Sequence, residues 1–458
     1  MTTTRDPRAT REASPRHGDD PPNGERLPRI DTAVPGPRGL AWVEALARSE
    51  CPAFTARRAR RAEQSGAPTD PIVWTSAVGS NVEDADGNVY VDFTSGFGVA
   101  AVGHRHPRVV SAITAQSEKL LHGLGDVYPS DVKIALLERL AALGPWRESR
   151  VILGLSGSDA IEAALKTAAL ATGRPGVIGF EGGYHGLAHG PLALCGYSEG
   201  FRRPFAAQLN PHARIAPWPP ESCGLDDALA PVRRLFEGHP SERPGAIVVE
   251  PIQGRGGVRI PPAGFLAGLR ALCVQHGALL IADEILTGLG RCGELLHSVR
   301  ETEPHLICIG KALGGGLPVS ACLGDAGIMQ AWGAPEGEAL HTGTFFGHPL
   351  GAAAALAVLD VLEDEGLVAR SRAMGSCLAE RMRERDLGDV RGAGLLLALP
   401  VGRPARTLSL VHALLMRGYL VLPAGADASV LQFVPPLTVT EPQVTGLVEA
   451  VAAAMGVP

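Results

Sequence analysis

The sequence predicts an α/β protein whose large domain holds a mostly parallel sheet flanked by helices, with a smaller α+β domain beside it. Three short runs are apolar throughout: GVIGF (176–180), AIVVEP (246–251) and ALLIADE (278–284). Continuous apolar runs are typical of strands that are covered on both faces, as in a parallel sheet. A helical stretch, residues 263–277, separates two of these runs, and this alternation favours an α/β sheet.

The first residues of the chain have too few apolar side chains to form a packed core. Residues 1–37 are rich in Pro, Arg and Asp and nearly lack apolar side chains, so we expect a disordered tail. The tail has no apolar signal-peptide core, and its acids argue against a transit peptide, which favours a cytoplasmic protein. Residues 80–96 hold an Asp-Gly-Asn turn between stretches rich in Val, Tyr and Phe, which predicts a β-hairpin. Residues 106–121 have helical spacing, with Val109 and Ile113 on one face.

The rest of the chain continues the alternation and then changes character. Residues 150–158 predict a strand that enters a turn, and residues 159–173 predict a helix that ends at Gly173. After residue 345, Ala/Leu-rich helices give way to short strands and a final helix. The predicted boundaries are 38–105 for the N-terminal segment of the small domain, 106–344 for the large domain and 345–458 for the C-terminal small domain.

Composition excludes several classes of function. The formal net charge is −6, and the sequence has no basic stripe with interleaved aromatics, so we expect no nucleic-acid partner. No apolar run approaches the roughly 20 residues of a membrane span. The eight cysteines form no CxxC pair, which indicates reduced thiols and no metal site.

Chemistry-bearing residues follow the predicted strands, and ligands of doubly wound sheets bind outside the carboxyl ends of the strands. Gly157 and Ser158 open a helix after a strand, where free N–H groups can bind an anion. A simple serine N-cap is the alternative. Asp283 and Glu284 end an apolar strand, so each carboxylate needs a partner. That partner is either a salt bridge at the sheet edge or a heterocyclic nitrogen that the carboxylate keeps protonated.

Two further segments add an aromatic ring and an amine. Tyr184 and His185 lie on the glycine-flanked loop FEGGYHG, where a ring can stack on a planar ligand or simply pack within the loop. Lys311 ends the apolar run LICIG and precedes three glycines. Either it is solvated at a strand end, or a low-dielectric pocket lowers its pKa and lets the neutral amine form a Schiff base with an aldehyde. All four features suit one ligand with a phosphate, a ring nitrogen and an aldehyde: pyridoxal 5'-phosphate (PLP).

Nine motifs occur in order between about residues 70 and 450: DADGNVYVDF, GHRHP, SGSDAIEAALK, YHG, EPIQG, ADEILTGLGRCG, GKALGGGLP, HTGTFFGHPL and PPLT. Together they resemble the class III (ω-type) aminotransferases of PLP fold type I. The resemblance implies that Lys311 forms the Schiff base with PLP and then moves the proton between Cα and C4′. It implies that Asp283 keeps the pyridine nitrogen protonated, that Ile285 packs beneath the ring, and that Tyr184 stacks above it.

The resemblance also implies contacts to the phosphate and to a second subunit. Gly157 and Ser158 would bind the phosphate, and His185 belongs to the cofactor-binding set. Thr344 would reach the phosphate of a neighbouring subunit, which implies a homodimer with shared active sites. Glu250, in EPIQG, resembles the family glutamate near the active-site lysine or substrate gate.

The sequence departs from the family pattern at two positions. Leu286 stands where the family usually has a glutamine that contacts the phenolic oxygen of the cofactor, and leucine has no hydrogen-bonding group. Gln432 stands where an arginine often binds the substrate α-carboxylate. Either another arginine serves, with Arg202 and Arg203 as candidates, or the preferred substrate has no carboxylate there.

The expected activity is the transfer of an amino group from an ω-amine or amino acid to a 2-oxo acid in ping-pong half-reactions. One alternative is an amino-acid racemase or aminomutase of the same family. The other is a catalytically silent PLP-binding protein.

Overall fold

The large domain is built on a seven-stranded sheet with the order β4-β10-β9-β8-β7-β5-β6. The computed structural model describes residues 24–66, 71–237, 243–333 and 338–457. From β9 to β6 all neighbouring strands are parallel, and only β10 runs against its two neighbours. The mostly parallel sheet is therefore confirmed. Its strands are β4 (Ser149–Gly154), β5 (Val177–Phe180), β6 (Ala213–Ala216), β7 (Ala246–Val249), β8 (Leu279–Asp283), β9 (Leu306–Ile309) and β10 (Ser320–Asp325).

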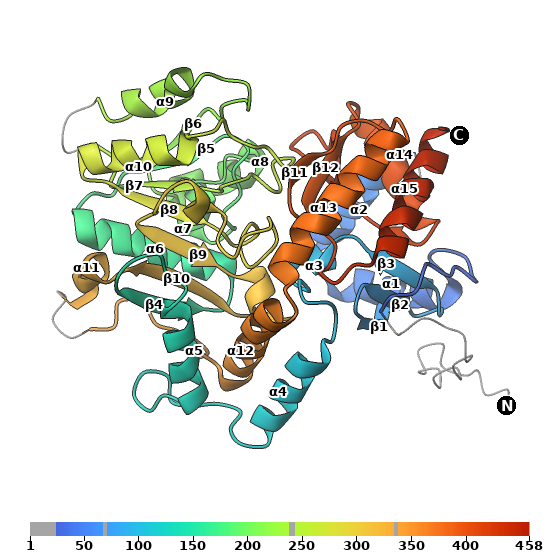
Figure 1. Cartoon of the computed structure of the whole chain (residues 1–458), viewed down its shortest axis with the longest axis horizontal. Coiled ribbons are helices and arrows are strands. Elements are labelled where there is room, and N and C mark those ends of the chain that lie inside the picture. Colours follow the sequence, from blue (N-terminus) through green and yellow to red (C-terminus); the bar gives the residue numbers. More distant parts are fainter. Residues whose placement is uncertain (1–23, 67–70, 238–242, 334–337, 458) are drawn as a thin grey trace.

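Both faces of this sheet are covered by helices, as Figure 1 shows. Ile247 and Val248 are adjacent in β7, and both are fully buried. Ile247 packs in an apolar cluster with residues of α10 (Phe265–His276), whereas Val248 packs in another with residues of α6 (Gly157–Thr172). This two-sided burial explains why the strands are apolar without alternation.

Local signals set the ends of α6. Ser156 and Asp159 form a reciprocal capping box at its N-terminus, and Gly173 ends it with a left-handed φ of +67°. Helix α4 (Pro107–Ser117) ends earlier than its periodicity predicts, and Leu121 beyond it is 57% exposed.

The other helices are α1 (Pro37–Ser49), α2 (Pro52–Ser65), α3 (Ser95–Gly98), α5 (Asp131–Ala141), α7 (His189–Ala193), α8 (Glu199–Arg202), α9 (Leu225–Arg234), α11 (Ala326–Met329), α12 (Pro349–Asp364), α13 (Leu367–Glu384), α14 (Pro404–Leu415) and α15 (Glu441–Met455). Short 3-10 turns are η1 (Arg203–Gln208), η3 (Ser298–Arg300), η4 (Lys311–Gly314) and η5 (Gln330–Gly333).

The small domain is assembled from both ends of the chain, as predicted. Strands β2 and β3 form the expected antiparallel hairpin, and β13 joins them in parallel, with Tyr419 opposite Val91. Figure 1 accordingly shows N-terminal and C-terminal elements side by side. Its two sheets have the orders β1-β2-β3-β13 and β11-β12-β15-β14. Their strands are β1 (Trp74–Val78), β2 (Asn81–Asp84), β3 (Val89–Asp92), β11 (Arg391–Ala393), β12 (Leu396–Pro400), β13 (Tyr419–Leu420), β14 (Leu422–Ala424) and β15 (Val430–Phe433).

The two domains are not separated by a sharp boundary in the chain. Helix α12, which the sequence analysis assigned to the small domain, packs against α4 and α5 of the large domain. Helix α13 then continues to the small domain, where it packs on β11 and α15. One apolar cluster includes Ile307 of the large sheet, Leu359 of α12 and Leu431 of the small domain. The two domains therefore share a continuous core that includes α12.

The predicted disordered tail needs a correction. Residues 1–23 lie outside the described part of the chain, but residues 24–37 are bound to the small domain. Arg29 and Val89 exchange two backbone hydrogen bonds of 2.8 and 2.9 Å, and the Asn88 side chain accepts from the N–H groups of Asp31 and Thr32. Hydrogen bonds of its backbone, rather than apolar side chains, hold residues 24–37 on the small domain. The low apolar content of the segment therefore did not predict this contact.

Candidate functional site

Lys311 lies where β9 leaves the sheet, at the first position of η4. Its φ of +40° is unusual for a residue with a side chain. Burial lowers the pKa of its ammonium group, and the nearby charges of Asp283 and Glu250 only partly oppose this effect. The position therefore favours a neutral amine more than a solvated strand end would.

Asp283 ends β8 and is 4% exposed. Its Oδ1 accepts a hydrogen bond from the N–H of Ile285 at 3.1 Å, and its Oδ2 lies 2.7 Å from Nδ1 of His185. The adjacent Glu284 is engaged elsewhere, because Thr287 Oγ1 and the Ser298 N–H both donate to it. The two neighbouring carboxylates thus have different roles, which the sequence pattern alone left open.

His185 and Glu250 lie behind this carboxylate. Burial lowers the pKa of His185, but the hydrogen bond and charge of Asp283 outweigh burial, so the net pKa is raised. Its Nε2 is buried and has no hydrogen-bond partner among the described residues. Glu250 accepts from the N–H groups of Tyr184 (2.9 Å) and Gly254 (3.1 Å). Burial raises the pKa of Glu250 to about 7.

The N-terminus of α6 packs closely against Ile285 and against the loop of Gly186, and glycines make these contacts possible. A Cβ at Gly157 would lie 2.9 Å from Ile285 Cδ1, and a Cβ at Gly186 would lie 2.0 Å from Ser158 Oγ. Only glycines allow the three segments to approach this closely. The first N–H groups of a helix have no intrahelical acceptor, so this end can bind an anion near Ile285.

A cavity of about 410 Å³ opens at Lys311 between the two domains. Of the predicted site residues, only Lys311 and Tyr184 line it directly; the others described so far form its supporting layer. The lining residues are Arg57, Arg61, Phe93, Thr94, Phe97, Tyr184, Tyr197, Arg255, Leu286, Lys311, Leu422, Pro423, Ala424, Gln432 and Val434. The three arginines were not predicted from the sequence, because Arg57 and Arg61 lie outside the motifs and Arg255 directly follows EPIQG without being part of it.

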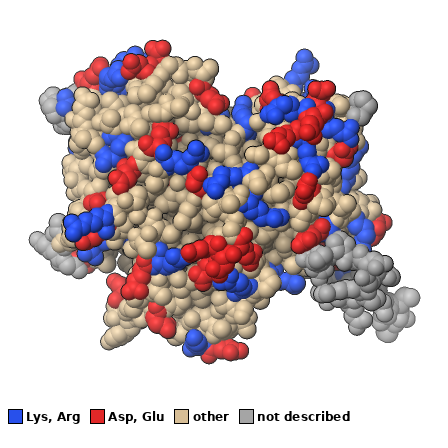
Figure 2. Space-filling model, viewed as in Figure 1, with Lys and Arg blue, Asp and Glu red and all other residues tan. Residues whose placement is uncertain are grey.

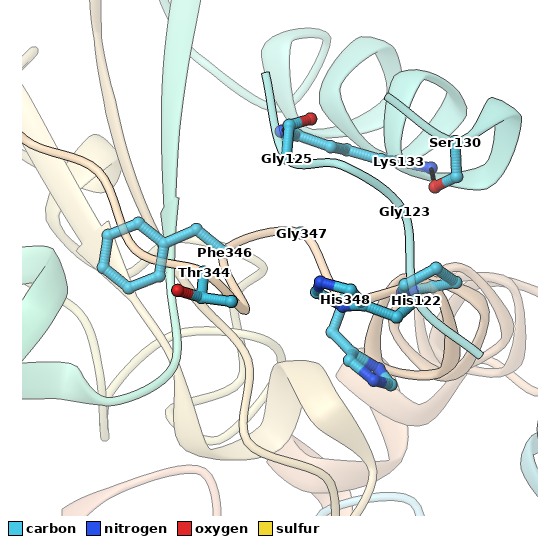
Figure 3. A pocket seen from close by; sticks show the side chains of 10 residues that line it. His122, Gly123, Gly125, Ser130, Lys133, Thr344, Phe346, Gly347 and His348 are labelled. Carbon is cyan, nitrogen blue, oxygen red and sulfur yellow. Dashed lines mark hydrogen bonds between the residues drawn. The ribbon is translucent and has the colours of Figure 1, made fainter. Parts of the chain in front are cut away.

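Thr344 lies in a different pocket, drawn in Figure 3. It is exposed there beside His122, Lys133 and His348, and Lys133 Nζ donates to the Gly125 carbonyl at 3.0 Å. Within one chain, therefore, the structure does not bring Thr344 to Lys311.

The arginine candidates named from the sequence are also outside the cavity. Arg202 pairs with Glu199 at 2.6 Å on the surface, and neither Arg202 nor Arg203 lines the cavity. Gln432 does line it, but its Nε2 donates to the Gly254 carbonyl at 2.9 Å. Leu286 packs near Gly98 and Gly254, where a Cβ on either glycine would come within 2.8 Å of it.

The donor set fits PLP. An amine with a lowered pKa suits an aldehyde, a buried carboxylate suits a pyridinium nitrogen, and a helix N-terminus suits a phosphate. A mostly parallel sheet that brings these three groups to its carboxyl edge defines a PLP-dependent enzyme.

Comparisons with known proteins give the family. The family model described as aminotransferase class-III matches residues 63–455, so the chain belongs to the class III aminotransferases. The 5-aminovalerate aminotransferase DavT of Pseudomonas aeruginosa is 38% identical over 81% of this chain and 91% of its own length. The acetylornithine aminotransferase of Corynebacterium efficiens is 36% identical over 84% of this chain and 93% of its own length.

Solved structures agree with this assignment. An amine transaminase from an uncultivated Pseudomonas species, in its PLP-bound internal aldimine form, superposes with a TM-score of 0.79 at 29% identity and covers 85% of this chain and 95% of its own. An (S)-enantioselective omega-transaminase from Thermomicrobium roseum gives a TM-score of 0.78 at 27% identity, with 84% and 93% coverage. The chain is thus a PLP-dependent aminotransferase of fold type I.

Neither a membrane-spanning helix nor a metal site occurs in the part of the chain that the structure describes. No helix there combines the length and apolar content that a membrane span requires. No group of three or more His, Cys, Asp or Glu side chains in the same part of the chain is arranged to hold a metal ion. On the face shown in Figure 2, basic and acidic side chains are interspersed.

Proposed function

We propose that this aminotransferase moves an amino group from an ω-amine or amino acid to a 2-oxo acid in two half-reactions within the cavity at Lys311. The observation that carries the proposal is the placement of Lys311, with its lowered pKa, in the cavity between the domains. Two relatives are named for amine-bearing substrates, 5-aminovalerate and acetylornithine, which supports a donor whose amine is not on the α-carbon.

Bound PLP supplies an aldehyde carbon conjugated with an electron-accepting ring. Lys311 is the proton carrier that the chain itself contributes. Its Nζ accepts the proton from the substrate Cα and releases it again as the amino group is transferred. Asp283 holds a proton on the pyridine nitrogen, because its carboxylate is buried and oriented by His185 and by the Ile285 N–H.

The remaining predicted residues orient and enclose the ring. Tyr184 and Ile285 would pack against the ring, and the helix end at Gly157 and Ser158 would bind the phosphate. Glu250 is a positioning residue, since it holds the loops of Tyr184 and Gly254 and makes no contact with the cavity.

Lys311→Ala tests the proposal. The wild-type holoenzyme is mixed with an amine alone, and then with pyruvate or 2-oxoglutarate, while its absorbance spectrum is followed. We expect conversion to the pyridoxamine form and then return; Lys311→Ala should remain folded and give neither step. Borohydride should trap PLP on Lys311 in the wild type and in the control Lys166→Ala, whose changed residue lies on α6. Racemisation of an amino acid without net amine transfer would indicate the racemase alternative, and no reaction across a broad amine panel would indicate the silent one.

We also propose a homodimer with shared active sites in the cytoplasm. Apolar side chains are exposed around the pocket of Thr344, including Leu124 (58%), Tyr128 (73%) and Phe345 (52%), and such patches are typical of subunit contacts. A second copy on this surface could bring Thr344 to its partner's phosphate. Sedimentation of wild type and Tyr128→Glu tests this: we expect a dimer that the charge weakens, together with weaker PLP retention. A wild-type monomer that retains PLP would contradict it.

All eight cysteines are free thiols, which supports a reducing compartment.

A further inference from the structure

The cavity at Lys311 has an excess of positive charge. Arg57, Arg61 and Arg255 line it together with Lys311, and no Asp or Glu occurs among its described lining residues. Arg57 and Arg61 are four residues apart on α2, so they lie on one face of that helix. Arg255 reaches the cavity from the loop that follows β7. Two distant parts of the chain thus supply cations to one site.

These cations lack the counter-ions that neighbouring arginines have. None of the three forms an ion pair with a described residue, whereas Arg58, the next residue after Arg57, pairs with Glu50. Burial lowers the pKa of the Arg61 guanidinium, and the charges of Arg57 and Arg255 lower it further. Like charges held together without a partner are stabilised when an anion binds between them.

Arg255 is held in a defined orientation. Its Cζ lies 4.3 Å from the centroid of the Tyr184 ring, 4.9 Å from that of Tyr197 and 5.5 Å from that of Phe201. Its backbone carbonyl accepts from the Gly425 N–H at 3.0 Å, which anchors the loop to the small domain. Arg255 also shares a side-chain hydrogen bond with Tyr184, and the five N–H groups of a guanidinium leave others for a carboxylate.

The other polar candidate cannot serve as this anion site. Gln432 is neutral, and its Nε2 is already bound to the Gly254 carbonyl. Its main effect is to hold β15 against the loop that carries Arg255. Gln432, which stands where the family often has a carboxylate-binding arginine, therefore supports the loop. Arg255 supplies the positive charge.

We propose that Arg255 binds the carboxylate of both the amine donor and the 2-oxo acid, and that Arg57 and Arg61 bind the second carboxylate of dicarboxylic substrates. The preferred substrates are thus ω-amino acids and dicarboxylic 2-oxo acids, and neutral amines are poor donors. This inference rests on the proposed transamination, because one cavity must accept both substrates in turn.

A matched pair of donors tests Arg255. 5-Aminovalerate and n-pentylamine have the same amine and chain length and differ in the carboxylate. Arg255→Gln should raise KM for 5-aminovalerate by about 10- to 100-fold, the effect of losing a charge-assisted hydrogen bond, and change the value for pentylamine by less than about threefold. The control Arg202→Gln removes a surface arginine outside the cavity and should affect neither donor. Equal effects of Arg255→Gln on both donors, or no effect on either, would overturn the inference.

A matched pair of acceptors tests α2. Arg61→Gln should raise KM for 2-oxoglutarate by about tenfold while leaving pyruvate nearly unchanged, because only the former has a second carboxylate. Loss of this selectivity, with pyruvate affected equally, would remove Arg57 and Arg61 from the proposal.

A binding measurement separates this inference from the proposed function. Calorimetric titration of the holoenzyme with glutarate, a dicarboxylate that cannot react, should give binding that weakens in Arg255→Gln and at higher salt. If no amine reacts with the wild type but glutarate still binds through Arg255, the proposed function fails and the anion site stands. If transamination proceeds and glutarate binds wild type and Arg255→Gln equally, the anion site fails alone.

Discussion

Replacing Glu250 with Gln should change how stability depends on pH. Glu250 is 7% exposed, and its pKa is raised from the ordinary 4.5 to about 7. Burial is the main cause; the charge of His185 and the N–H groups of Tyr184 and Gly254 oppose it, and the charge of Asp283 adds to it. Glutamine keeps the shape of the side chain and removes the ionisation.

The magnitude follows from the two pKa values. The folded protein holds the Glu250 proton more tightly than the unfolded chain, so this residue stabilises the fold fully below pH 4.5. That stabilisation is lost as pH rises toward 7 and is absent above it. The rise from 4.5 to about 7 corresponds to about 3 kcal/mol, at roughly 1.4 kcal/mol for each pH unit. Between pH 5 and 8 the change is about 2–3 kcal/mol.

Urea denaturation of wild type and Glu250→Gln, at a fixed and saturating PLP concentration, measures this difference at each pH. Glutamine cannot accept from both the Tyr184 and Gly254 N–H groups, so the variant should lose about 1–3 kcal/mol at pH 5. At pH 8 this deficit should be largely cancelled, because the wild type then bears the cost of the buried charge. Infrared difference spectra should show the band of a protonated carboxylic acid near pH 6 only in the wild type. A free-energy difference between the two proteins that stays constant from pH 5 to pH 8 would refute the reasoning.

Two further substitutions probe the cofactor site and the junction of the domains. Asp283→Asn should lower kcat by roughly 10²–10³-fold, because no carboxylate then holds the ring proton. Rapid-mixing absorbance measures this rate. A decrease of less than about tenfold would mean that another group holds the proton. Arg291 is 1% exposed and donates to the Pro435 and Leu395 carbonyls and to Ser95 Oγ, while burial lowers its pKa to about 10. Arg291→Met should destabilise the fold by about 1–3 kcal/mol, since the orphaned carbonyls outweigh the relief of the buried charge; an unchanged urea midpoint would contradict this.

Local sequence was sufficient for most of the large domain. The apolar runs around Ile247, Leu280 and Ile307 became buried parallel strands, because residues covered on both faces leave an unbroken apolar pattern. The end of α6 at Gly173 was predicted from the sequence, but its N-cap is Ser156 rather than Ser158, because Ser156 and Asp159 form the capping box. The PLP chemistry was also legible, because a lysine and a carboxylate at strand ends share one edge of the sheet.

Other features depended on contacts between distant residues. Residues 24–37 dock through backbone hydrogen bonds to Asn88 and Val89, which composition does not encode. Asp283 and Glu284 are adjacent in sequence, yet one pairs with His185 and the other with Thr287. Neither outcome could be derived from the residue types alone.

The sequence by itself determined the apolar strands, the end of α6 at Gly173 and the motifs of a class III aminotransferase, because each of these signals is local in the chain. The tertiary structure decided which arginines face the cavity. Arg202 was the candidate by motif and lies paired on the surface, whereas Arg61 and Arg255 are brought together from α2 and the loop after β7. Electrostatic interaction depends on distance in space, and only folding sets the distance between charges that are far apart in the chain.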